Sequence, residues 1–155
     1  MAQAPRAWAN VAAMAIRNAS ALWQGTLLEG TGVVRTGQGG YEGNYSFRSR
    51  FQEGEGTNPE ELIGAAHAGC FSMALAKALT DAGFPPTSVE TAAAVHLEPV
   101  DGAQTVTRID LTTTGEVPGI DEAEFQKLAE ATKTGCPISR LLAPGTEITL
   151  SANLI

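Results

Sequence analysis

The chain has 155 residues, of which 43% are hydrophobic and 17% are charged, a composition that predicts one folded domain with an apolar core and excludes a disordered chain. Ten basic and seventeen acidic residues give a formal net charge of −7, which argues against nucleic acid or an anionic membrane surface as a partner. No run of apolar residues reaches the roughly eighteen that a membrane span needs. We expect residues 1–18 to be a loosely ordered N-terminal extension and residues 19–155 to form a single domain.

The first half of that domain reads as three strands followed by a helix. Short β-rich segments over 21–26, 32–36 and 45–51, with a glycine cluster between the last two, predict a meander. A helix then begins with Asn58 as cap and Pro59 in the first turn, and Gly83 is positioned to end it. The middle of this helix is small or apolar on every side, which is typical of a helix enclosed by other structure.

The second half predicts a hairpin, two helices and a final strand. Strands over 89–98 and 105–117 flank a turn at 101–102. The next helix begins at Asp121, with Glu124 placed to close a capping box and Ile120 and Phe125 forming a hydrophobic staple. It ends near 134–135, a short helical turn covers 136–142, and a strand covers 147–154. The order βββαββαβ indicates an α+β fold with mainly antiparallel sheets.

The only two cysteines, Cys70 and Cys136, are too few for a secreted disulfide framework, so a cytoplasmic protein with both as thiols is expected. Each could simply be a small buried hydrophobe. A thiol of ordinary pKa is only about 3% ionised at pH 7, so a reactive cysteine needs a group that stabilises its charge. The residues alone favour Cys136 as the nucleophile, because it lies at the N-terminus of a short helix, whereas Cys70 is well inside a long one.

Two histidines offer further chemistry. His67 stands three residues before Cys70 on the same helix face, where a Cys–His pair is conceivable, although a satisfied core histidine is the stronger interpretation. The two histidines, His67 and His96, and the two cysteines are together enough ligands for one zinc site. The spacing lacks a paired CxxC or HxxxH element, so no metal is expected.

A resemblance then emerges from longer motifs. The run GTNPEELIGAAHAGCFSMAL over 56–75, preceded by Arg50-Phe51 and followed far downstream by GCPIS over 135–139, closely resembles the osmotically inducible protein C (OsmC) family. The resemblance covers about residues 19–155. It implies an intertwined homodimer with sheets around two central helices, and a peroxidase without metal or bound organic cofactor.

The resemblance also implies roles for individual residues. Cys70 becomes the residue that attacks the peroxide and Cys136 the resolving thiol, which overrules the preference for Cys136. Arg50 matches the arginine that holds the thiolate and the peroxide, and Glu61 matches the carboxylate that positions this arginine. Helix geometry places Glu61 and Cys70 on opposite sides of one helix, so we expect Glu61 to act in the partner subunit's site.

The resemblance implies reduction of organic hydroperoxides, and less efficiently of hydrogen peroxide, through a Cys70 sulfenic acid and a Cys70–Cys136 disulfide. An external dithiol of lipoyl type is expected to reduce this disulfide. The alternative is a redox-inert binding or structural dimer with buried cysteines. Five apolar side chains are candidates to contact the hydrocarbon tail of a peroxide, although packing in the core explains their apolar character equally well. They are Leu62, Phe71, Met73, Ile138 and Leu142.

Overall fold

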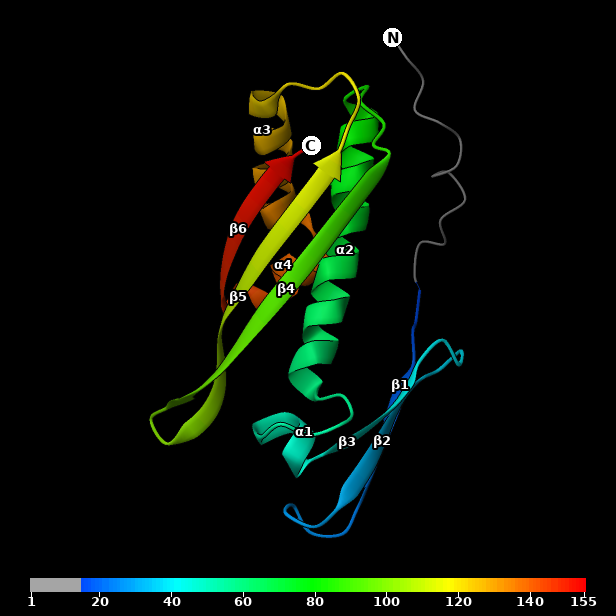
Figure 1. Cartoon of the computed structure of the whole chain (residues 1–155), viewed down its shortest axis with the longest axis vertical. Coiled ribbons are helices and arrows are strands. Elements are labelled where there is room, and N and C mark those ends of the chain that lie inside the picture. The colour runs from blue at the N-terminus through cyan, green and yellow to red at the C-terminus, as the bar shows by residue number, and fades with distance from the viewer. Residues whose placement is uncertain (1–14) are drawn as a thin grey trace. The chain divides into compact units, whose positions relative to one another are not determined.

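The computed structural model describes residues 15–155, so most of the expected N-terminal extension lies outside the described part (Figure 1). The chain divides into two compact units, one ending at Pro59 and the other running from Glu60 to Ile155. Each unit is described by itself below. That residues 19–155 form a single domain stays a prediction.

The first unit is a three-stranded antiparallel meander followed by a short helix. Strands β1 (Ala19–Gln24), β2 (Thr31–Thr36) and β3 (Glu42–Ser46) pair in sequence order, which confirms the predicted meander. The third predicted strand was wrong beyond residue 46, because Phe47–Phe51 form helix α1.

A local cap explains this helix. The Ser46 hydroxyl accepts a hydrogen bond from the Ser49 backbone N–H at 3.1 Å, and the Ser49 hydroxyl accepts one from the Ser46 N–H at 2.9 Å. This reciprocal capping box satisfies two N–H groups of the first turn and so favours helix over the β preference of the aromatic residues around it. The cap places Arg50 on a helix instead of a strand.

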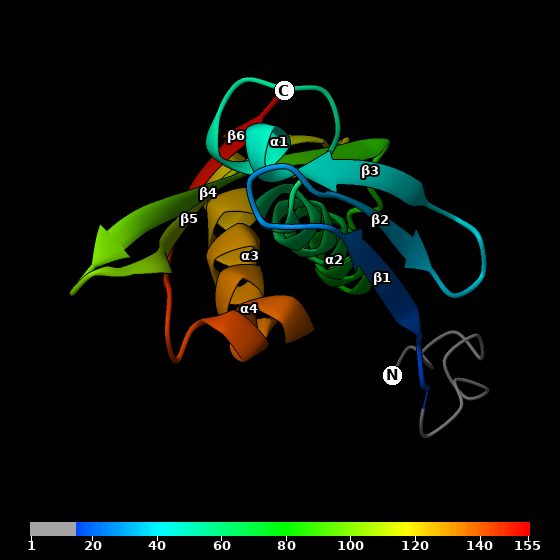
Figure 2. The ribbon, with the colours of Figure 1, turned by 90° about the horizontal axis from the view of Figure 1, so that it is seen from below.

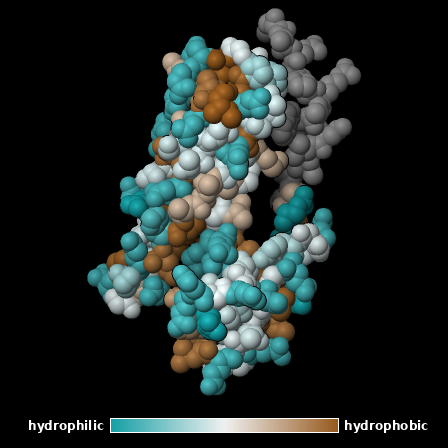
Figure 3. Space-filling model, in the orientation of Figure 1, coloured by the Kyte–Doolittle hydropathy of each residue, from teal (hydrophilic) through white to brown (hydrophobic). Residues whose placement is uncertain are grey.

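The second unit packs two helices against one face of a three-stranded sheet (Figures 1 and 2). Strands β4 (Ser88–Val100) and β5 (Ala103–Glu116) form the predicted hairpin, whose turn residues Asp101 and Gly102 both have positive φ. Strand β6 (Glu147–Leu154) pairs with β5 in parallel, so this sheet is mixed. Figure 3 shows hydrophilic and apolar residues interspersed over its outer face.

The helices of this unit begin and end close to where the sequence predicts. Helix α2 (Pro59–Asp81) is followed by Gly83, whose φ of +92° suits glycine, and the Phe84 N–H closes back on the Leu79 carbonyl. Helix α3 (Glu122–Gly135) is capped by Asp121, which accepts from the Glu124 N–H at 2.9 Å. Ile120 and Phe125 are both buried, as the staple requires. Helix α4 (Pro137–Leu142) follows at once.

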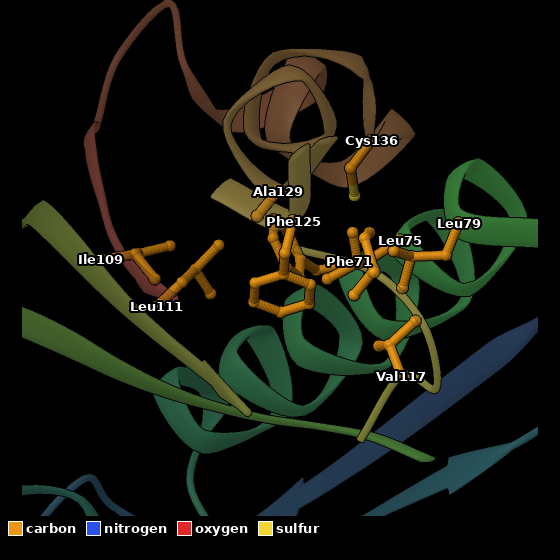
Figure 4. Close-up of a cluster of buried hydrophobic side chains, with 10 residues drawn as sticks. Phe71, Leu75, Leu79, Ile109, Leu111, Val117, Phe125, Ala129 and Cys136 are labelled. Carbon is orange, nitrogen blue, oxygen red and sulfur yellow. The ribbon is translucent and has the colours of Figure 1, made fainter. Parts of the chain in front are cut away.

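The core of this unit lies between the sheet and helices α2 and α3 (Figure 4). Its centre is formed by completely buried side chains from all three elements, namely Phe71, Leu75, Leu79, Ile109, Phe125, Ala129 and Cys136.

The expectation that α2 is enclosed on every side is wrong for the single chain. Gly64, His67, Phe71, Leu75 and Leu79 are buried on one side, while Ala65, Gly69 and Met73 are exposed on another. By length and composition alone α2 could cross a membrane, but its buried stripe supplies the core of this unit. An apolar helix with one open side needs further cover.

Candidate active site

The two cysteines, 66 positions apart in sequence, are brought together by α2 and the α3–α4 junction. The Cys70 and Cys136 sulfurs lie 3.0 Å apart, and both residues are free thiols. A disulfide bond is about 2.05 Å long, so a sulfur movement of about 1 Å would join them.

The α3–α4 junction fixes the backbone of Cys136. Its N–H donates to the Thr132 carbonyl at 2.9 Å, which closes α3, and its own carbonyl accepts from the Arg140 N–H at 3.0 Å, which opens α4. Figure 4 shows the Cys136 side chain pointing from this junction toward α2. The same backbone hydrogen bonds that end one helix and start the next therefore orient this thiol.

The two thiols differ in accessibility. Cys136 is 0% exposed and belongs to the hydrophobic core, whereas Cys70 is half-buried at the core's edge. A reagent approaching from solvent therefore reaches Cys70 first. This burial favours the order of roles that the family resemblance implies over the local preference for Cys136.

The surroundings of Cys70 within its unit do not ionise it. Burial raises the pKa of the Cys70 thiol, the hydrogen bond with the Cys136 thiol raises it further, and charge repulsion between the two sulfurs adds a smaller rise. A hydrogen bond from the Ile138 backbone N–H lowers the pKa of Cys70 but does not outweigh these effects. A cation is the kind of group that could restore the thiolate.

The Ile138 contact shows that the N-terminus of helix α4 also acts on Cys70. Proline has no N–H, so with Pro137 in the first position Ile138 supplies the first backbone amide of this helix. That amide donates to the Cys70 sulfur. The positive end of the short helix thus acts on Cys70, a connection that spacing along the chain could not reveal.

Arg50 lies in the first unit, on helix α1, where it lines a cavity of about 250 Å³. The rest of the lining is mainly aromatic and apolar and includes Trp23, Leu27, Tyr45, Phe47 and Phe51. The Arg50 guanidinium lies 5.0 Å from the centroid of the Phe51 ring, within the range of a cation–π contact. How Arg50 relates to Cys70 stays a prediction.

Two adjacent carboxylates begin α2, and the structure distinguishes them. Glu61, the residue singled out from sequence, is exposed, whereas Glu60 is only 9% exposed. A buried carboxylate requires compensation by a cation or hydrogen bonds, so Glu60 is a candidate that sequence reasoning missed. The helical period of the sequence could have identified Glu60, because it lies on the same face of α2 as the buried residues Gly64, His67 and Phe71.

The five predicted apolar walls do not share one environment. Ile138 and Leu142 are half-buried and pack against the core cluster, as Cys70 does, and Leu62 is half-buried near the start of α2. Phe71 is 0% exposed, so its side chain supports the core and offers no surface to a ligand in the single chain. Met73 is 76% exposed on the open side of α2.

The histidines pair with residues other than the cysteines. His67 is completely buried, its Nε2 atom lies 2.8 Å from the Ser139 hydroxyl, and its Nδ1 atom has no hydrogen-bond partner. Burial lowers the pKa of His67, which favours the neutral ring. His96 instead lies 2.7 Å from the Asp110 carboxylate on the β4–β5 hairpin. Within residues 15–155, no three His, Cys, Asp or Glu residues form a group that could hold a metal ion.

Comparisons with known proteins give one family match and several similar sequences. Residues 52–151 match the OsmC-like protein family. Peroxiredoxin OsmC of Escherichia coli strain K12 is 46% identical over 139 residues, which cover 89% of this chain and 96% of the relative. An organic hydroperoxide resistance protein of Xanthomonas axonopodis pv. citri is 33% identical over 99 residues, covering 63% of this chain and 68% of that protein.

Solved structures show the same fold. The organic hydroperoxide resistance protein from Elizabethkingia anophelis superposes with a TM-score of 0.72 at 22% identity, covering 91% of this chain and 99% of that one. A counterpart from Bacillus subtilis gives a TM-score of 0.67 at 22% identity, with 88% and 98% covered.

Proposed function

Since the chain belongs to the OsmC-like protein family, we propose that it is a thiol-dependent peroxidase that reduces organic hydroperoxides, and hydrogen peroxide less efficiently. The observation that carries the proposal is the thiol pair itself. A half-buried sulfur lies 3.0 Å from a fully buried one, so an oxidised Cys70 has its reaction partner already in place.

The reaction has three balanced steps. The Cys70 thiolate attacks one peroxide oxygen and the O–O bond breaks, so that Cys70 becomes a sulfenic acid. The departing alkoxide takes up a proton, equivalent to the one that Cys70 released on ionisation, and leaves as the alcohol. The Cys136 thiol then attacks the Cys70 sulfur and expels water as the disulfide forms. An external dithiol, of lipoyl type, finally reduces the disulfide and is itself oxidised. No metal or organic cofactor takes part.

Arg50 supplies the positive charge that Cys70 needs. Its guanidinium would stabilise the Cys70 thiolate and the negative charge on the departing oxygen, and a carboxylate at the start of α2 would orient it. The family resemblance assigns this role to Glu61, whereas the burial of the side chain favours Glu60. Ile138 and Leu142, which are half-buried and pack against the same core as Cys70, provide apolar surface for the hydrocarbon part of a substrate.

The active protein is a homodimer. Ala65, Gly69 and Met73 form an exposed small and apolar stripe on α2, and small residues allow a second helix to approach closely. Glu61 and Cys70 are nine residues apart, which on a helix means about 13.5 Å along the axis and about 180° around it. An antiparallel α2 from the partner would bring its Glu61 near Cys70, so each site would combine residues of both subunits.

The rival function is a redox-inert binding or structural dimer whose cysteines only fill the core. The two are separated by titrating free thiols before and after one equivalent of organic hydroperoxide. A peroxidase loses both thiols and regains them with a dithiol, whereas the rival keeps both. Cys70→Ser should abolish the reaction, while Cys136→Ser should react once and stop at a sulfenic acid open to further oxidation.

The substrate class has its own test. An apolar cavity can use a hydrocarbon tail at about 0.8 kcal/mol per buried CH₂, so kcat/KM should be higher for cumene or fatty-acid hydroperoxides than for hydrogen peroxide. Equal efficiency with hydrogen peroxide would contradict an apolar substrate site. The acidic chain is proposed to act in the cytoplasm, with neither nucleic acid nor membrane as partner.

A further inference from the structure

Two groups that contact Cys70 lie at the start of helix α4. Cys136 precedes it and the Ile138 N–H lies in its first turn. The helix has only six residues, and its N-terminus has no side-chain cap. Its single fully buried side chain is a polar one, Ser139, at 1% exposure.

That serine is hydrogen-bonded across the core to α2. Its hydroxyl lies 2.8 Å from Nε2 of His67, which is itself 0% exposed, so neither group can turn to water instead. Breaking this bond would leave both polar atoms unsatisfied, which makes separation of the two helices unfavourable. Burial lowers the pKa of His67 and so favours the neutral ring, which suits a hydrogen bond to an uncharged hydroxyl.

The positions of this pair mirror those of the thiols. His67 stands three residues before Cys70 on α2, and Ser139 stands three residues after Cys136 at the start of α4. Residues three apart on a helix share a face. The His67–Ser139 bond therefore links the same two segments as the sulfur–sulfur contact, about one helical turn away from it.

We propose that His67 and Ser139 are positioning residues that hold Cys136 against Cys70, so that the protein forms its disulfide before Cys70 is oxidised further. The first part of this inference concerns the thiol pair alone, and the consequence for peroxide rests on the proposed function. Two fates compete for the Cys70 sulfenic acid. Attack by the Cys136 thiol gives the disulfide and water, whereas a second hydroperoxide gives sulfinic acid and one alcohol. Only the first fate depends on where α4 is held.

The lead variant is Ser139→Ala, which removes the hydroxyl and keeps Cβ. His67→Leu removes the imidazole that bonds to Ser139. His67→Gln keeps a side-chain amide that can hydrogen-bond to the Ser139 hydroxyl, so it should retain much of the positioning of Cys136 that His67→Leu loses. Ile109→Val serves as a matched control, because Ile109 is a fully buried member of the same core but lies on strand β5, outside α2 and α4.

The first measurement needs no peroxide. The protein is equilibrated with glutathione redox buffers, and the fraction of Cys70–Cys136 disulfide is determined by thiol trapping and mass spectrometry. Ser139→Ala should lower the equilibrium constant for disulfide formation roughly two- to tenfold, the range expected for one lost hydrogen bond. Ile109→Val should leave it unchanged. Equal constants for Ser139→Ala and wild type, or an equal drop in Ile109→Val, would overturn the positioning role.

The second measurement tests the consequence. Protein is treated with excess organic hydroperoxide, and the ratio of Cys70 sulfinic acid to disulfide is measured, which does not depend on how fast the first oxidation occurs. The ratio should rise roughly two- to tenfold in Ser139→Ala and His67→Leu, and much less in His67→Gln. If wild-type Cys70 is not oxidised at all, the proposed function and this consequence both fail, while the glutathione result still decides the positioning role. An unchanged ratio in Ser139→Ala would overturn the consequence alone.

Discussion

Met73 offers a direct test of the proposed dimer. Its side chain is 76% exposed in the single chain, on the open side of α2. Fully burying a methionine is worth about 1.5–3 kcal/mol, so covering the exposed three quarters in a partner interface would contribute about 1–2 kcal/mol. Two-fold symmetry doubles this contribution to about 2–4 kcal/mol per dimer, and Met73→Ala should therefore raise the dimer dissociation constant roughly 30- to 1,000-fold.

The assay is sedimentation velocity over a wide concentration range, with circular dichroism to confirm that the helix content is unchanged. Ile155→Ala is the matched control, because Ile155 is also 76% exposed but lies at the C-terminus, outside the α2 stripe. Alanine is a strong helix former, so the substitution should not disturb α2 itself. A monomeric wild type, or Met73→Ala and Ile155→Ala with the same dissociation constant as wild type, would refute this reasoning.

Other predictions concern single side chains. Arg50→Lys should lose nearly as much peroxidase activity as Arg50→Ala, because an ammonium cannot replace a planar, bidentate guanidinium; steady-state rates within a few-fold of wild type would contradict this. Mixing inactive Cys70→Ser chains with inactive Glu61→Ala chains under exchange should restore activity if Glu61 serves the partner's site, and repeating the mixture with Glu60→Gln will show which carboxylate anchors Arg50. Burial lowers the pKa of His67, so below about pH 6.5 this histidine binds a proton more readily in the unfolded chain than in the folded chain. Its contribution to stability is thus complete above that pH and declines below it, and urea midpoints at pH 7.5 and 5.5 should differ less in His67→Gln than in wild type.

The parts of the fold that local chemistry determines could be predicted from the sequence. The cap at Asp121 with its Ile120–Phe125 staple and the turn at Asp101-Gly102 each depend on a few neighbouring residues, and the structure confirms them. The segment after β3 was misassigned although its signal was also local. The Ser46–Ser49 capping box outweighs the aromatic residues that favour a strand.

Non-local pairings could not be read from the chain. The parallel alignment of β6 with β5 joins segments about forty residues apart and has no signature within either strand. The same holds for the candidate site. The residues alone predict Cys136 as the better nucleophile, because the sequence places it at the N-terminus of a short helix. That this terminus directs the Ile138 amide at Cys70, and that Cys136 is sealed in the core, both depend on how α4 packs against α2.

In the proposed thiol cycle, the complete burial of Cys136 would also determine how the Cys70–Cys136 disulfide is reduced. An incoming dithiol can attack only the disulfide sulfur it can reach, and that sulfur belongs to the half-buried Cys70. Cys136 is then always the leaving group, released into an apolar core, while the reductant becomes transiently linked to Cys70. The choice of sulfur is thus made by packing and not by thiol acidity. A mixed disulfide trapped with a monothiol and mapped by mass spectrometry should be found on Cys70, and its discovery on Cys136 would mean that α4 opens during turnover.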